Sequence, residues 1–303
     1  MTYDSLWLRK LAYLGARYGS SKFVRISPAI IGAVLSGILV SHRRVVLENL
    51  RLILGKRDMF SEQRDIARTF AEFGSCLAES LGSERMDPKQ MRYKVLGGSV
   101  LNELVRDCSG FVVLTAHAGA WDLAARHLQQ ELGRSVMIAM TREPNLAARQ
   151  FHDSIRLRRG IEITHVGDNA FEGLPLLRHL RNGGVLAVQL DRIPKGSRAL
   201  AVALFGQEFK VPIGPFRLAS LANVPLVPVF CARIGHFKYE VNVHQPIRLR
   251  RRPSAEQLQA AAREASHELE RFLQRYPTQW FNFEPARVQS TNRRHRSDGA
   301  NDP

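Results

Sequence analysis

The sequence has little cysteine, with three residues in 303: Cys76, Cys108 and Cys231. An odd number of widely spaced cysteines forms neither a metal-binding pattern nor an obvious disulfide framework, and it fits a reducing compartment. We also expect no metal and no resident cofactor, because several histidines do not stand at metal-ligand spacing with one another. These are His127, His152, His165 and His179.

The chain also lacks a long uninterrupted hydrophobic run, and no cleavable signal pattern is evident near its start. Its most apolar stretch, residues 26–40, contains Ser27, Pro28 and Ser36. Fifteen helical residues span about 22 Å, less than the hydrocarbon core of about 30 Å. Basic residues on both sides instead favour a segment that lies in the membrane interface. The alternative is a buried core helix with solvated basic flanks.

Acidic residues are scarce relative to basic ones, 28 against 44, which gives a net charge of +16. Such a surplus predicts anionic partners: nucleic acid, an anionic membrane surface, or acidic substrates and carrier proteins. No zinc-finger, homeodomain or RNA-recognition pattern accompanies the charge, so we expect no nucleic-acid partner. The excess is mostly arginine, which favours contacts with phosphate groups.

Apolar periodicity predicts an α/β fold in which a mixed, mainly parallel central sheet is flanked by helices, after a helical N-terminal region. Helices are expected at residues 3–18, at 26–54 with a break near Gly37 or Ser41, and from Ser61 onward. Strands and helices then alternate. The expected strands are residues 111–116, 136–140, 161–166, 185–190, 226–231 and 239–243, and the expected helices are residues 123–132, 145–159, 169–182, 214–222 and 255–275.

Three regions follow from this pattern. Residues 1–90 form a helical, membrane-associated region, and residues 91–288 form the α/β domain with a C-terminal helix that Ser254 caps. Residues 289–303 are polar and poor in apolar side chains, which predicts a disordered tail. Residues 204–206 and 211–215 are interpreted as parts of a loop.

The most informative segment is residues 112–122, an apolar run that stops at His117 and is followed five residues later by Asp122. A buried strand that leads into a helix places both residues where open α/β sheets bind their ligands. Histidine suits a general base near neutral pH, and a nearby carboxylate can hold its ring in one tautomer. The alternative is that Asp122 merely caps a helix and His117 is a hydrogen-bonded edge residue.

No Gly-x-Ser-x-Gly pattern is present, so a covalent serine intermediate is not expected. Gly119 would let a substrate approach the backbone closely, whereas Trp121 is interpreted as a core residue in preference to part of a channel.

Two further side chains follow predicted strands and should lie at the same edge of the sheet as His117. Arg142 suits a phosphate on the substrate, with a structural ion pair to Glu143 or Asp122 as the alternative. Asp191 is the second, and its alternative is a purely structural turn residue. On the helix at residues 145–159, at most two of its three C-terminal arginines can reach the site.

The His-x-x-x-x-Asp pattern is accompanied, in a fixed order, by further short motifs. Together they resemble, from roughly Ile30 to Pro285, the lipid A biosynthesis (lauroyl/myristoyl) acyltransferases of the lysophospholipid acyltransferase superfamily. This chain departs from them at Asp122, where these enzymes more often carry glutamate, and at Arg192, where they carry glutamine. The motifs are Arg44 to Leu50, Arg156 to Gly160, Leu190-Asp191-Arg192, Leu204-Phe205-Gly206, Pro225 to Phe230, and Gln279-Trp280.

The resemblance implies an acyltransferase of class EC 2.3.1. Such an enzyme moves a fatty acyl chain from acyl carrier protein or coenzyme A to a hydroxyl of a glycolipid. His117 would be the base with Asp122 as its partner, and Asp191 and Arg192 would help to shape the site. The resemblance favours Arg156 or Arg158 for substrate binding, and we assign Arg158 beside Arg142. It also implies a peripheral or interfacial location on the cytoplasmic face of the inner membrane.

Two alternatives remain open. A glycerolipid or lysophospholipid acyltransferase would carry Asp in the motif, as here, but also a Glu-Gly-Thr-Arg element that this sequence lacks. A basic nucleic-acid-binding or membrane-scaffold protein without catalysis would require the His/Asp pair to be incidental.

Overall fold

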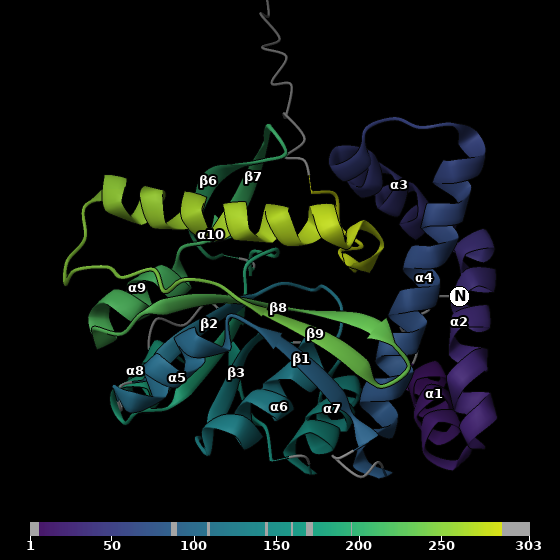
Figure 1. Ribbon diagram of the computed structural model, residues 1–303, viewed down its shortest axis with the longest axis horizontal. Helices are drawn as coiled ribbons and strands as arrows, with labels where there is room; N and C mark the ends of the chain where they lie inside the picture. The colour runs from purple at the N-terminus through teal and green to yellow at the C-terminus, as the bar shows by residue number, and fades with distance from the viewer. Residues whose placement is uncertain are drawn as a thin grey trace, which may run out of the picture.

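The computed structural model describes residues 6–85, 90–107, 110–142, 145–158, 160–167, 172–194 and 196–286. The predicted tail at residues 289–303 and Cys108 lie outside this part of the chain. A helical region comes first, as the sequence predicted, and the break in its second predicted helix makes four helices. They are α1 (Leu6–Tyr18), α2 (Ser21–Ile38), α3 (Val40–Leu54) and α4 (Met59–Gly82). The apolar helix α2 lies along the longest of them, α4 (Figure 1).

The boundaries of these helices follow from local capping. The predicted break in the second helix falls at Leu39, which ends α2 and begins α3. Helix α4 begins two residues before the expected Ser61, because the carboxylate of Asp58 accepts a hydrogen bond from the Ser61 amide at 2.9 Å and acts as the N-cap. The expected start at Ser61 was therefore wrong by one half-turn.

Helix α2 packs closely along α4 through two glycines. A Cβ atom at Gly32 would collide with the carbonyl oxygen of Phe70, and one at Gly74 would collide with the carbonyl oxygen of Pro28. On the opposite side α2 leaves Ile30 exposed. Helix α2 begins at Ser21, five residues before the predicted start at residue 26. By length and composition its 18 residues are enough to cross a membrane.

The α/β domain confirms the predicted fold class. A seven-stranded sheet has the order β1-β9-β8-β2-β5-β3-β4, in which only the β8–β9 pair is antiparallel. The predicted strands are present within a few residues of their expected bounds. The strands of the sheet are β1 (Arg92–Leu96), β2 (Phe111–Thr115), β3 (Val136–Thr141), β4 (Glu162–Val166), β5 (Val185–Gln189), β8 (Leu226–Gly235) and β9 (Lys238–Val243).

Strand β2 is the middle strand of the sheet, and all five of its residues are buried. Phe111 and Val113 face one hydrophobic core, and Val112 and Leu114 face the other. Side chains alternate along a strand, so the continuous apolar run requires cover on both faces, and the helices supply it (Figure 1). The covering helices are α5 (Gly98–Arg106), α6 (Trp121–Leu132) and α7 (Leu146–Arg158), and then α8 (Gly173–Arg181), α9 (Gly214–Ala222) and α10 (Ala255–Arg275).

The interpretation of residues 204–206 and 211–215 as parts of a loop was wrong. Strands β6 (Ala199–Leu204) and β7 (Gln207–Pro212) form an antiparallel hairpin, and helix α10 packs against it. The two turn residues, Phe205 and Gly206, both have positive φ, as a tight two-residue hairpin turn requires. A phenylalanine in that position gives no turn signal in the sequence, which explains the error.

Candidate active site

His117 lies two residues beyond the end of β2, at the carboxyl edge of the parallel strands. Its ring Nδ1 is 2.8 Å from Oδ1 of Asp191, and its backbone amide donates to both carboxylate oxygens at 3.0 and 3.1 Å. An ionised carboxylate only accepts hydrogen bonds, so in the neutral form of the ring Nδ1 carries the proton and Nε2 keeps a free lone pair. The side chain is 21% exposed, so a substrate can reach it.

Asp191 is completely buried beside this imidazole. The indole Nε1 of Trp280 donates to its Oδ2 at 2.9 Å. Burial alone would raise the pKa of Asp191, but the charge of His117 and hydrogen bonds from the His117 ring, Trp280 and the His117 amide outweigh it and lower the pKa to about 2. The carboxylate is therefore ionised at neutral pH and can stabilise an imidazolium.

Asp122 lies in the first turn of α6 and contacts groups from two other helices. Ser80 of α4 donates its hydroxyl to Oδ2, and Nε of Arg156 in α7 lies 3.4 Å from Oδ1. The Arg156 guanidinium also stacks 5.9 Å from the ring of Trp121. From the sequence, Asp122 was predicted to be the orienting partner of His117. The His117 ring donates its hydrogen bond to Asp191 instead, and the catalytic role of Asp122 stays a prediction.

The loop from His117 to Ala120 has its backbone amides already engaged. Ala118 donates to the Ala116 carbonyl, Gly119 to Gln279 and Ala120 to Cys231, at 2.7 to 2.9 Å. None of these four amides is therefore available to an oxyanion that develops near His117.

Gly119 has a different role from the one expected. Its φ is +54°, and a Cβ atom there would collide with the carbonyl oxygen of Cys231 in the neighbouring strand. The glycine is required by backbone packing inside the protein, and the expected close approach of a substrate is not its explanation.

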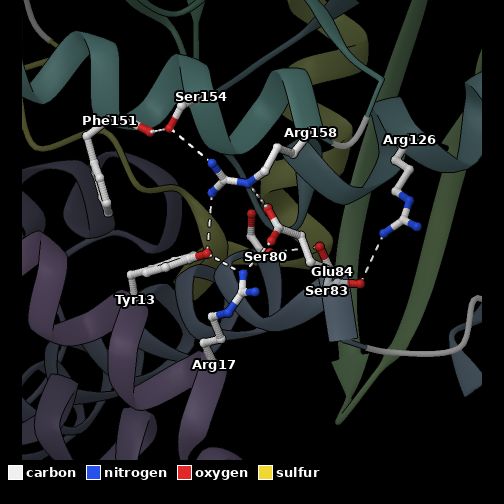
Figure 2. Close-up of polar contacts among 9 residues, drawn as sticks. All are labelled: Tyr13, Arg17, Ser80, Ser83, Glu84, Arg126, Phe151, Ser154 and Arg158. Atoms are coloured by element: carbon white, nitrogen blue, oxygen red, sulfur yellow. Dashed lines mark hydrogen bonds and ion pairs between the residues drawn. The ribbon is translucent and has the colours of Figure 1, made fainter.

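The predicted arginines occupy three separate places. Arg142 is 55% exposed and pairs with Glu172 at 2.9 Å, so neither of the pairings considered from the sequence is needed to explain it. Arg158 contacts Glu84 and the hydroxyl of Tyr13, both at 3.3 Å (Figure 2). Arg156 is the one that reaches Asp122, and residue 159 lies outside the described part of the chain. Substrate binding by Arg142 or Arg158 stays a prediction.

Arg192 follows Asp191 directly and faces the C-terminal segment of the chain. Its Nη2 donates to the carbonyl oxygen of Phe281 at 3.3 Å. Its buried Nε makes no hydrogen bond, and Oε1 of Glu284 lies 4.0 Å away. This donor without a hydrogen bond lies in the same short segment as Asp191, the partner of His117.

A cavity of about 240 Å³ lies between the sheet and helices α5 and α6. Thr115 and Trp121 line it at the end near His117, and its walls are otherwise mostly apolar. Asn102 and Glu131, which are exposed, line it farther from the strand ends. Trp121 thus lines a cavity, which favours a place in a channel over the purely core role preferred from the sequence.

Two residues of this arrangement were not predicted as site residues. Trp280 was noted only as a closing tryptophan of the resemblance, without a contact to Asp191. Ser80 gave no signal, because its link to Asp122 joins α4 and α6 only in the folded protein. Within the described residues, no group of three or more His, Cys, Asp or Glu side chains could hold a metal ion.

Comparison with known proteins identifies the family to which this chain belongs. Residues 5–286 match the family described as bacterial lipid A biosynthesis acyltransferase. The phosphatidylinositol mannoside acyltransferases of two Mycobacterium tuberculosis strains, CDC 1551/Oshkosh and ATCC 25618/H37Rv, are each 27% identical over 140 residues. That stretch is 46% of this chain and 44% of the relatives, so the match spans under half their length. Because the family match covers nearly the whole chain, this protein belongs to the bacterial lipid A biosynthesis acyltransferase family.

Proposed function

We propose that this protein is an O-acyltransferase that moves a fatty acyl chain from an acyl thioester to a hydroxyl of a membrane glycolipid. The observation that carries the proposal is the contact between His117 and the buried Asp191 at the edge of the sheet. It presents a neutral imidazole nitrogen to solvent with a fixed negative charge behind it, which is the arrangement that general-base catalysis requires.

In the proposed reaction, Nε2 of His117 removes the proton of the acceptor hydroxyl. The oxygen attacks the thioester carbonyl, and the C–S bond breaks as the tetrahedral intermediate collapses. The leaving thiolate then takes the proton from the imidazolium, so His117 returns to its starting state. Arg192, whose Nε makes no hydrogen bond, is our candidate for stabilising the oxyanion, because the amides of residues 117–120 are already engaged.

The cavity behind Thr115 and Trp121 is our candidate site for the acyl chain. Its walls are largely apolar and it begins beside the residues that precede and follow His117, so a chain bound there would end with its carbonyl near the imidazole. The donor is an acyl carrier protein or coenzyme A thioester, and the positive net charge suits both, since each carries negative charge.

Location at a membrane surface is supported by the exposed side of α2. Its outward residues are apolar, while Gly32 and Gly74 hold the other side against α4. Because α4 carries charged residues along its length, we propose that α2 lies in the interface and does not cross the bilayer on its own. The outward apolar residues are Ile26, Ile30, Val34 and Ile38.

A lipid A-like glycolipid is our proposed acceptor, on the strength of the family and of relatives named for a phosphatidylinositol mannoside. The test incubates the purified protein with acyl-carrier-protein and coenzyme A thioesters and with three acceptors in vesicles: a lipid A precursor, a phosphatidylinositol mannoside and a lysophospholipid. Mass spectrometry should show acylation of a glycolipid. Acylation of the lysophospholipid alone would favour the glycerolipid alternative and contradict the proposed acceptor.

A further inference from the structure

The C-terminal segment Gln279–Phe281 is hydrogen-bonded to the loop that carries His117. The Gly119 amide donates to the Gln279 carbonyl at 2.8 Å, and the Phe281 amide donates to the His117 carbonyl at 2.7 Å. Between these two bonds, the side chain of Trp280 turns inward and donates to Asp191. The segment therefore contacts both members of the pair proposed to perform the chemistry.

The two oxygens of the Asp191 carboxylate have separate side-chain partners. Oδ1 faces Nδ1 of His117 at 2.8 Å, and Oδ2 accepts from the indole of Trp280 at 2.9 Å. Trp280 is only 3% exposed, so its N–H would have no water to bond if Asp191 were turned away. Each partner thus holds the carboxylate in the orientation that serves the other.

We infer that Trp280 is a positioning residue for the acyl transfer, acting on His117 through the carboxylate of Asp191. The indole N–H of Trp280 fixes the rotation of the Asp191 carboxylate. It also partly neutralises the negative charge of that carboxylate, which therefore stabilises the His117 imidazolium less. This inference rests on the proposed function for its link to catalysis, while the hydrogen-bonded relay itself does not depend on it.

The segment that presents Trp280 is held from two sides. The side-chain amide of Gln279 exchanges two hydrogen bonds of 2.8 Å with the backbone of Arg233. The side chain of Asn49 in α3 donates to the Asn282 carbonyl at 2.8 Å and accepts from the Ala286 amide at 3.2 Å. The indole is therefore presented from a fixed backbone, as positioning within a fraction of an ångström requires.

The charged groups around the relay come from several elements. Asp191 contacts the ring of His117, and Arg192 follows Asp191 in the chain. Asp122 lies at the start of α6, and Arg156 of α7 contacts Asp122 and stacks on Trp121. Trp280 is uncharged, so replacing it by phenylalanine removes one hydrogen bond and changes none of these charges. That makes Trp280→Phe a direct test.

For Trp280→Phe we expect kcat to fall by about tenfold to a hundredfold, as when an outer-shell partner of a functional histidine is removed, with KM little changed. The acidic limb of the pH profile of kcat/KM should move to higher pH by about half a unit, less than the one unit or more that a direct charge partner produces.

The matched control is Phe209→Leu, which alters the aromatic neighbour whose ring centroid lies 6.3 Å from that of Trp280 but leaves the indole N–H in place. The acidic limb of the kcat/KM profile of Phe209→Leu should stay at the wild-type pH.

A second readout does not require turnover. In protein labelled with ¹⁵N in the tryptophan indoles, the Trp280 signal is identified by its loss in Trp280→Phe. It should shift with pH at the same midpoint as the acidic limb, and this shift should vanish in His117→Gln. The wild type could transfer no acyl chain while the indole signal still followed the titration of His117. The proposed function would then fail, but the hydrogen-bonded chain Trp280–Asp191–His117 would be supported. An indole signal that ignores His117, or a Trp280→Phe variant that behaves like Phe209→Leu, would overturn the inference.

Discussion

The imidazole Nδ1 of His117 lies 2.8 Å from the carboxylate of Asp191, although 74 positions separate the two residues. The register of the sheet produces this contact. Thr115 at the end of β2 pairs with Gln189 at the end of the adjacent parallel strand β5, and each site residue lies two positions beyond its strand. Because the ends of β2 and β5 are neighbours, the base and its acidic partner lie next to each other at the edge of the sheet.

The first prediction separates the two aspartates. Asp191→Asn should lower kcat by about three to four orders of magnitude, because loss of the charge removes support for the imidazolium and permits the wrong tautomer. Asp122→Asn should be milder, because its carboxylate contacts Ser80 and Arg156. Both variants are assayed for acyl transfer with one thioester and one acceptor. A more severe loss in Asp122→Asn would reverse the assignment of the acidic partner.

Acid stability provides a second prediction. The pKa of Asp191 is about 2 in the folded protein and 3.8 for an unperturbed group, so its stabilisation is present above pH 4 and is lost as the pH falls towards 2. The loss amounts to about 2 kcal/mol in the free energy of unfolding. Urea unfolding, followed by circular dichroism from pH 5 to pH 2, should show a smaller decline for Asp191→Asn. Equal declines in the two proteins would contradict the lowered pKa.

The proposed acyl site predicts a change in chain-length preference. Ala124 lines the cavity, so Ala124→Phe should fill part of it and shift the preferred donor towards shorter acyl chains. Gln130→Phe places the same phenyl ring at an exposed position of the same helix and serves as the control. Competition among saturated acyl thioesters of different lengths measures the preference. An unchanged preference in Ala124→Phe would place the acyl chain elsewhere.

The exposed side of α2 predicts binding to anionic vesicles. Ile30→Glu or Val34→Glu should weaken that binding at least about tenfold, since each removes an apolar side chain that the interface would bury. Leu174→Glu changes an equally exposed leucine in α8 and should have little effect. Co-sedimentation with phosphatidylglycerol vesicles is the measurement. Equal weakening by all three substitutions would show a general charge effect and not a specific surface.

Much of the fold could be predicted because the strongest sequence signals are local. The apolar run of β2 predicts a strand buried on both faces, and its end at His117 predicts the edge where the site lies. The contacts that complete the site could not be predicted from local pattern. Pairing of His117 with Asp191 depends on which strands are neighbours, and the Asp122 contacts join three helices. The β6–β7 hairpin was missed because a Phe-Gly turn carries no standard signal.

The proposed mechanism requires His117 to remove the proton of the acceptor hydroxyl. It is tested most directly by the kcat/KM of acyl transfer for the wild type and for His117→Ala, with an acyl thioester and a glycolipid in vesicles. Loss of the base should lower kcat/KM by about two to four orders of magnitude, with the fold intact by circular dichroism. A His117→Ala protein that retains the wild-type kcat/KM would contradict the account.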